Sequence, residues 1–171
     1  MDIMDIIQAR YSCRHYLDKP IEPDKLHKIL EAARLAPSAR NYQDWRFVIV
    51  RETERKQQLA RAANNQMFIA QAGAIIVGCS NNDHVMRCAQ PIGPIDLAIA
   101  MEHMCLQATE SGLATCWIGS FYPDQVRDIL GIPKTVQIIE LLSLGYPADQ
   151  GQQNTRDPLD SIVCYETWQF R

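Results

Sequence analysis

Residues 96–121 read DLAIAMEHMCLQATESGLATCWIGSF and combine one long helix with one buried strand. Asp96 is a favoured N-cap residue and Gly112 is a favoured stop, so the pattern predicts a helix over Asp96–Ser111. A helix that is apolar nearly all round is buried on several faces. In a chain this short, we expect the extra face to meet a second subunit. The apolar residues that wrap the helix are Leu97, Ala98, Ala100, Met101, Met104, Cys105 and Ala108.

The sequence on either side alternates helical and strand patterns, which predicts an α+β layered fold. The apolar tail after Pro158 is expected to dock on its own core or on a partner's. Predicted helices cover Asp2–Ala9, Pro23–Leu35, Thr53–Ala62 and Pro123–Leu130, with a short helical turn over Asn65–Gln71. Predicted strands cover Arg46–Val50, Ala74–Cys79, Ala114–Ile118 and Gln137–Leu144. The apolar tail residues are Leu159, Ile162, Val163, Tyr165, Trp168 and Phe170.

Composition is that of an ordinary globular protein. The 171 residues are 47% hydrophobic and 22% charged, which favours one domain over residues 1–171. The net charge of −3 argues against a nucleic-acid partner. No apolar run reaches the roughly 18 residues of a membrane span, and the acidic segment Met1–Asp5 does not resemble a signal peptide. We therefore expect a cytoplasmic protein with neither a membrane nor a nucleic-acid partner.

The cysteines and histidines do not form a recognisable site. Six cysteines lie at positions 13, 79, 88, 105, 116 and 164, and no two form a C-x-x-C pair. Several lie inside apolar runs such as Ile75–Cys79, so buried free thiols explain them better than disulfides. The four histidines show no H-E-x-x-H spacing, and no metal site is expected.

The chain lacks the glycine loops that cradle nucleotide phosphates. It contains no G-x-G-x-x-G, no G-x-x-x-x-G-K-[ST] and no G-x-S-x-G motif. Side chains would therefore hold a phosphate, and Arg10-Tyr11-Ser12-Cys13-Arg14 offers two guanidinium groups and a hydroxyl. If helical geometry continues, Arg10 and Arg14 share one face, with Ser12 close by. A solvated basic helix end is the alternative interpretation.

Two further loops offer groups suited to a flat heterocycle. Residues 36–45 contain small side chains and amides, although an ordinary helix-to-strand connection is the simpler interpretation. Trp117–Phe121 ends a predicted strand, and Gly119 would let a backbone N–H approach a bound ring. A tight turn after a buried strand explains this segment equally well.

Taken together, four blocks resemble the nitroreductase family of flavoproteins. Arg10–Tyr16 is similar to that family's R-x-S-x-R-x-[FY] opening, and Ala36–Phe47 is similar to its A-P-S-x-x-N-x-Q-P-W-x-F loop and strand. The third block is Asp96–Phe121. The fourth is Leu144–Pro147, followed by Arg156 and by Glu166-x-Trp168. The blocks occur in family order over nearly the whole chain.

The resemblance implies a central mixed sheet flanked by helices, in a domain-entwined homodimer with two tightly bound FMN molecules at its interface. It also implies which residues bind FMN. The phosphate and ring edge would be held by Arg10, Tyr11, Ser12 and Arg14, with Arg156 as a further phosphate contact. The second subunit would lend Pro37, Ser38, Ala39 and Asn41 to the flavin. Asn65 would contact the pyrimidine side, and Trp117, Ile118, Gly119 and Ser120 would lie along one ring face.

The resemblance further implies an enzyme that uses NAD(P)H to reduce a small acceptor, such as a nitroaromatic or a quinone, by ping-pong hydride transfer. No catalytic side chain is expected because the flavin carries the chemistry, but Arg10 or Arg14 would stabilise the anionic reduced flavin. The chain departs from the family pattern at Asp44, where proline is usual, and at Ser120, where a second glycine is common.

Other functions are open from the sequence alone. A flavin-binding carrier or sensor would show the same features without turnover. A thiol redox protein could use Cys13 or Cys116, because the arginines beside Cys13 could lower its pKa. Flavoenzymes that dehalogenate a substrate or break flavin down are further alternatives, although they usually need a lid, and there is little room for one between Cys79 and Asp96.

Overall fold

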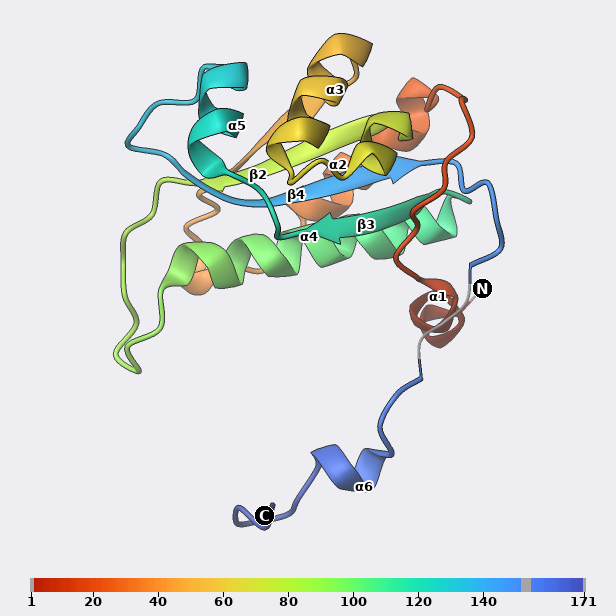
Figure 1. Ribbon diagram of the computed structural model, residues 1–171. Coiled ribbons are helices and arrows are strands. Elements are labelled where there is room, and N and C mark those ends of the chain that lie inside the picture. The colour runs from red at the N-terminus through yellow and green to blue at the C-terminus, as the bar shows by residue number, and fades with distance from the viewer. Residues whose placement is uncertain (1, 152–154, 171) are drawn as a thin grey trace.

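The computed structural model describes residues 2–151 and 155–170. Figure 1 shows helices on both faces of a twisted sheet, which confirms the predicted α+β class. The helices are α1 (Ile3–Ala9), α2 (Pro23–Arg34), α3 (Thr53–Ala62), α4 (Ile92–Glu110), α5 (Pro123–Leu130) and α6 (Leu159–Ile162), with 3-10 turns η1 (Ala39–Asn41) and η2 (Met67–Gln71). The strands are β1 (Trp45–Val50), β2 (Ala74–Ser80), β3 (Ala114–Ile118) and β4 (Gln137–Gly145).

The four strands form one sheet in the order β1-β2-β4-β3, and every neighbouring pair is antiparallel. The resemblance led us to expect a mixed sheet. The strands β2 and β3 do run in the same direction, because α4 connects them as a crossover, but β4 lies between them. Among the described residues, parallel pairing is therefore limited to the isolated bridge between Ser12 and Thr115.

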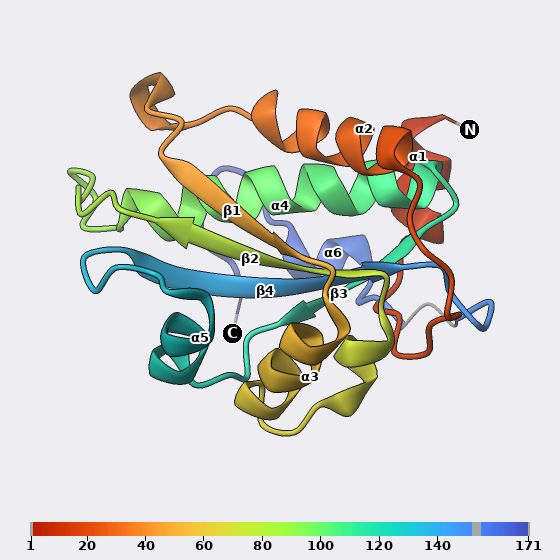
Figure 2. The ribbon, with the colours of Figure 1, turned by 90° about the horizontal axis from the view of Figure 1, so that it is seen from above.

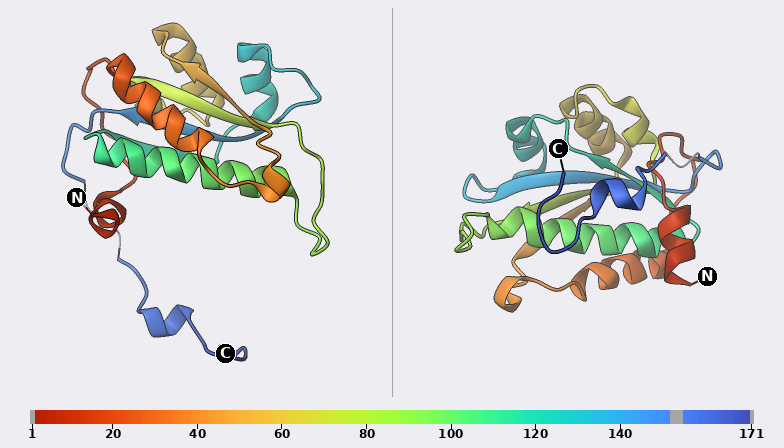
Figure 3. Two further views of the ribbon diagram at one scale, coloured as in Figure 1. Left: turned by 180° about the vertical axis from the view of Figure 1, so that it is seen from behind. Right: turned by 90° about the horizontal axis from the view of Figure 1, so that it is seen from below.

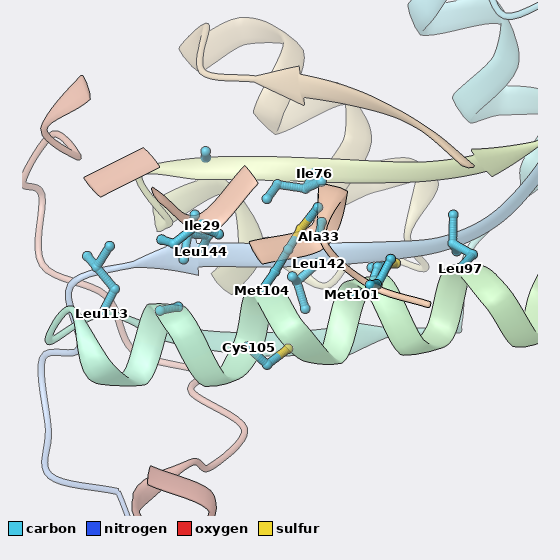
Figure 4. Close-up of a cluster of buried hydrophobic side chains, with 14 of the residues drawn as sticks. Ile29, Ala33, Ile76, Leu97, Met101, Met104, Cys105, Leu113, Leu142 and Leu144 are labelled. Atoms are coloured by element: carbon cyan, nitrogen blue, oxygen red, sulfur yellow. The ribbon is translucent and has the colours of Figure 1, made fainter. Parts of the chain in front are cut away.

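Two buried layers hold the helices on the sheet. The helices α2 and α4 lie side by side over one face, and α3 and α5 cover the other (Figures 2 and 3). Figure 4 shows Met101 and Met104 of α4 among buried side chains of α2 and the sheet. A Cβ on Gly78 of β2 would lie 2.8 Å from Met101 Sδ, so glycine permits this close approach. The apolar residues of α4 are thus buried on more than one side of the helix, as predicted.

The helix α4 begins at Ile92, and its predicted start at Asp96 is wrong. Pro94 lies in the first turn, where a backbone N–H has no helical partner, so proline does not end the helix there. Asp96 is buried instead, and it accepts hydrogen bonds from the Ala39 N–H at 3.0 and 3.1 Å. Although α4 has 19 residues, neither it nor any other helix of the described ranges is long and apolar enough to span a membrane.

The tail exposes its apolar side chains. Leu159 is 70% exposed, Ile162 60% and Trp168 81%. Figure 1 shows α6 and the following residues leading away from the sheet and its helices. The tail therefore does not dock on the core of its own subunit, which was one of the two expected positions.

Candidate functional site

The segment from Arg10 to Arg14 lies along the β3 edge of the sheet. Arg10 has an extended conformation (φ −66°, ψ 130°) because α1 has already ended, so the predicted helical face shared by Arg10 and Arg14 is wrong. Ser12 pairs with Thr115 in a parallel bridge, and the Cys13 N–H donates to the Thr115 carbonyl at 2.9 Å. The sheet edge therefore holds the two arginines and Ser12 in one extended row.

Both arginines keep donors available for an anion. Arg10 Nε lies 3.7 Å from Glu102 Oε1 of α4, and Arg14 Nη1 reaches the Ser12 carbonyl at 3.5 Å. A guanidinium carries five N–H donors, and neither contact is short. Burial raises the pKa of the Cys116 thiol on β3, and the charges of Arg14 and Arg10 both oppose this rise, so both charges act at the same place. This donor set fits a phosphate group.

The end of β3 contributes an exposed turn to the same edge. Gly119 and Ser120 are exposed, and Gln66 Nε2 donates to the Ser120 carbonyl at 3.1 Å. This bond brings exposed Asn65 (φ 58°) near the turn. We call Arg10, Ser12, Arg14, Gly119 and Ser120 the β3-edge site. Gln66 was not predicted, because only its tertiary contact distinguishes it from other surface amides.

The side chains of Trp117 and Ile118 pack in the hydrophobic core. Ile118 is 3% exposed, and Trp117 packs against the buried cluster around α4. These two residues can therefore offer a ligand mainly their backbone, which is compatible with the predicted role of this segment along a ring face.

A buried carboxyl group lies beneath the turn and was also not predicted. A Cβ on Gly119 would lie 3.6 Å from both carboxyl oxygens of Glu140 on β4. Glu140 Oε1 is buried and has no hydrogen-bond partner among the described residues. Burial raises the pKa of Glu140, and the backbone N–H groups of Leu141 and Ile118 oppose the rise. The sequence feature that could have indicated Glu140 is its position as the one charged residue inside the apolar run Gln137–Gly145.

The loop Pro37–Asn41 lies far from the β3-edge site of its own subunit. It contacts Asp96 near the start of α4, whereas α1 and the segment that follows it lie toward the other end of α4 (Figure 2). Pro37 and Asn41 are exposed, and the Ser38 hydroxyl accepts a hydrogen bond from the Gln43 N–H at 3.1 Å. The structure thus separates the two groups of predicted FMN contacts within one chain.

Tyr11 and Arg156 are the remaining predicted residues, and Tyr11 contacts the segment that follows β4. Burial raises the pKa of Tyr11, whose hydroxyl donates to the Asp149 carbonyl at 2.9 Å. A Cβ on Gly151 would overlap the Tyr11 ring, so this position favours glycine. Arg156 follows in the second described range, where it is exposed and its Nη1 donates to the Thr155 carbonyl at 3.2 Å. The C-terminal segment thus starts beside Arg10–Arg14.

The thiols do not support a redox role. Cys13 is fully buried, and its Sγ donates to the His15 carbonyl at 3.1 Å. Burial raises the pKa of Cys13, so the expected lowering by neighbouring arginines is wrong. Cys116 is 3% exposed, and its pKa is also raised. All six cysteines are free, as predicted, and four of them are buried.

Comparisons with known proteins identify the family of the chain. The family model "Nitroreductase family" matches residues 7–91 and 68–146. A protein of Archaeoglobus fulgidus named "Putative NADH dehydrogenase/NAD(P)H nitroreductase" is 32% identical over 153 residues, which cover 87% of each chain. An NAD(P)H FMN reductase of Bacillus subtilis is 29% identical and covers 98% of this chain and 74% of its own.

A solved structure shows the same fold. It is that of a nitroreductase family protein from Clostridium difficile 630, which is 36% identical and superposes with a TM-score of 0.89. The match covers 98% of this chain and 100% of the other. With two overlapping segments of the family model spanning most of its length, the chain belongs to the nitroreductase family.

Proposed function

We propose that the chain binds FMN at the β3-edge site and uses NAD(P)H to reduce a small acceptor. The observation that carries this proposal is the extended row of Arg10, Ser12 and Arg14 along β3, the strand that ends at exposed Gly119. The same sheet edge then offers cationic donors for a phosphate and a backbone that a planar ring can approach, because glycine has no side chain in the way.

The names of relatives support the same function. The Bacillus subtilis relative is named an NAD(P)H FMN reductase, and a 26% identical protein of Vibrio harveyi is named an NADPH-flavin oxidoreductase. The chain is an NAD(P)H-dependent oxidoreductase, and our proposal adds tightly bound FMN as its cofactor and a nitroaromatic or quinone as its acceptor.

The residues of this chain bind and orient the reactants. When bound, FMN supplies hydride chemistry between a nicotinamide and an acceptor. Arg10 and Arg14 hold the phosphate and set positive charge at the ring edge, and the Ser12 hydroxyl adds a neutral donor. Gly119 would let its backbone N–H approach the ring. FMN would carry the chemistry between a reductant and an acceptor that bind in turn, so the chain would need no nucleophile or general base of its own.

We also propose that the active form is a homodimer of one FMN-binding domain, residues 1–171, per subunit. A second copy would bring its own Pro37–Asn41 loop to the β3-edge site, since the loop of the same chain lies elsewhere. Apolar surface is available for such contact. Ile95 and Ile99 of α4 are 38% and 37% exposed, and α1, α2 and α4 form an apolar groove of about 530 Å³.

The test is FMN binding by wild-type protein and by Arg10→Ala, followed by absorbance and by flavin fluorescence. Loss of one charge-assisted contact, about 1.5–3 kcal/mol, predicts FMN affinity reduced roughly 10- to 100-fold with unchanged far-UV circular dichroism. Arg55→Ala is the control, because Arg55 is an exposed arginine of α3 that pairs with Glu52, the residue before the helix. A wild-type protein that takes up no FMN would disprove the proposal. Bound FMN that neither NADH nor NADPH reduces would identify a carrier or sensor instead.

A further inference from the structure

A small cavity of about 260 Å³ lies between η1 and the loop Asn81–Pro91. The residues that line it come from both segments and from the start of α4: Ala39, Arg40, Tyr42, His84, Val85, Met86, Arg87 and Ile92. None of them belongs to the β3-edge site of the same subunit. Under the proposed function, however, Ala39 belongs to the loop that reaches the flavin of the second subunit.

Two arginines at this cavity have no anionic partner. Neither Arg40 nor Arg87 forms a side-chain hydrogen bond or ion pair with any residue in the described ranges, and both are exposed. His84 Nδ1 lies 3.6 Å from Asp83 Oδ1, and none of the residues that line the cavity is acidic. The cavity therefore carries net positive charge that the chain itself does not neutralise. A guanidinium fork is well suited to a carboxylate.

The loop that carries Arg87 is fixed by its own hydrogen bonds. The Ile92 N–H donates to the His84 carbonyl at 3.0 Å, and the Met86 N–H donates to the Gln90 carbonyl at 2.8 Å. The His84 N–H donates to Asn82 Oδ1 at 2.9 Å. These bonds close the loop upon itself, so the cavity wall is formed before any ligand arrives.

The turn that carries Arg40 is anchored from below. Asp96 binds the Ala39 N–H, and Ser80 links the two segments because its hydroxyl donates to Asp44 and accepts from the Asn82 N–H. Arg40 has a left-handed backbone (φ 50°), a conformation that costs a non-glycine residue energy and persists only where its surroundings hold it. Asp44, the departure from the family's proline, thus ties η1 to the loop Asn81–Pro91.

The other lining groups favour a flat apolar body. Ile92 is buried and Met86 is half-buried at the cavity, while the rings of Tyr42 and His84 meet edge to face with centroids 5.4 Å apart. Pockets for drug-sized ligands measure about 300–1,000 Å³, so this cavity suits a single ring. An aromatic ring that carries one anionic group satisfies both the apolar surface and the two guanidinium groups.

We propose that this cavity selects acceptors that are monocyclic aromatic anions, with Arg40 and Arg87 binding the anionic group. The inference rests on the proposed function for the reaction itself. For a nitroaromatic acceptor, NAD(P)H and one proton convert the nitro group to a nitroso group and water, with NAD(P)⁺ as the other product. Two electrons pass in each turnover, and the carboxylate of the acceptor is unchanged.

Ligand binding tests the cavity independently of turnover. Benzoate and its uncharged counterpart benzamide are compared by saturation-transfer NMR on the wild-type protein and on Arg40→Gln/Arg87→Gln. We expect a benzoate signal that exceeds the benzamide signal in the wild type, and loss of this preference in the double variant. The control is Arg55→Gln, which removes a distant exposed arginine and should keep the preference. Equal signals for both ligands in the wild type would overturn the proposal.

Kinetics then test selection of the acceptor. The ratio of kcat/KM for 4-nitrobenzoate to that for 4-nitrobenzamide, at equal bound flavin, should fall at least tenfold in Arg40→Gln/Arg87→Gln. An unchanged ratio would overturn the proposal. So would a variant in which flavin reduction by NADPH slows relative to reduction by NADH, since the arginines would then bind the nucleotide phosphate. A protein that binds benzoate selectively but no FMN would disprove the proposed function and leave the cavity assignment standing.

Discussion

Glu140 is a carboxyl group that the fold buries without a full set of hydrogen bonds. Burial raises its pKa, so the native state keeps the proton over a pH range in which the unfolded chain has lost it. The free energy of unfolding should therefore fall as the pH rises from the ordinary glutamate value of about 4.3 through the higher native value. Glu140 thus stabilises the fold least in neutral and alkaline solution.

Replacing Glu140 by glutamine tests this directly. The substitution keeps the side-chain size and removes the charge, so Glu140→Gln should raise the free energy of unfolding at pH 8 by roughly 1 kcal/mol, the scale of a buried unsatisfied polar group. At pH 4 the two proteins should unfold alike, because both side chains are then neutral. Urea denaturation at the two pH values measures the difference. Glu54→Gln on α3 is the control, because it removes one charge at an exposed position, and an equal gain of stability at pH 8 in both variants would contradict the assignment.

At the residue scale, side-chain chemistry was easier to predict than position. Arg10, Ser12 and Arg14 were selected because phosphate needs cationic donors, and they do form one row, but the row is extended and not helical. Glu140 was missed because a single charge in an apolar strand does not say which neighbour it meets. That Arg40 and Arg87 share a cavity also depends on contacts between distant segments.

At the element scale, Gly145 shows why the end of β4 must be glycine. A Cβ there would lie 2.8 Å from the backbone nitrogen of Gly73 and 2.9 Å from Tyr16 Cδ1. Backbone atoms cannot turn aside as a side-chain end can. Gly145→Ala should therefore lower the free energy of unfolding by about 2 kcal/mol, within the usual cost of overpacking a core. The conformation itself is not strained, since no left-handed φ is recorded at this position.

A matched control uses Gly119, whose Cβ would meet only ordinary contacts at 3.6 Å from Glu140. Gly119→Ala should change the free energy of unfolding by less than about 0.5 kcal/mol. Thermal unfolding of both variants, followed by circular dichroism, gives the comparison. Equal losses of stability would mean that the close contacts around Gly145 are not what excludes a side chain at this position.

Element boundaries were predicted well where a single residue starts or stops an element through its own backbone preference. Gly131 ends α5 in the left-handed conformation (φ 67°), and β3 has its predicted bounds. The start of α4 at Ile92 was missed because Asp96 is a favoured N-cap residue in the sequence, whereas its carboxylate binds the Ala39 N–H instead. The antiparallel strand order could not be predicted from the sequence either. The position of β4 between β2 and β3 depends on packing between segments that are distant in the chain.

At the scale of the whole molecule, the chain exposes more surface than its mass requires. A compact monomer of 19.5 kDa has an accessible surface of about 8,500 Å², whereas this chain exposes 10661 Å². The excess, about 2,000 Å² for one chain, exceeds the roughly 800 Å² that each partner buries in an interface of standard size. Much of the exposed apolar surface lies on the tail and along α1 and α4, on one side of the molecule (Figure 1).

This surface predicts a dimer whose stability depends on the tail. The side chain of Trp168 is 81% exposed and packs edge to face on Phe170, so it is available as an aromatic anchor for a partner. Wild-type protein should sediment as a dimer at micromolar concentration, and Trp168→Asp should raise the dimer dissociation constant at least tenfold, because a charge would replace a buried ring. Gln125→Asp adds the same charge at an exposed position of α5, on the opposite face of the sheet, and should leave the dimer intact. A wild-type monomer would leave the excess surface unexplained and would contradict the proposal that a second subunit brings its Pro37–Asn41 loop to the β3-edge site.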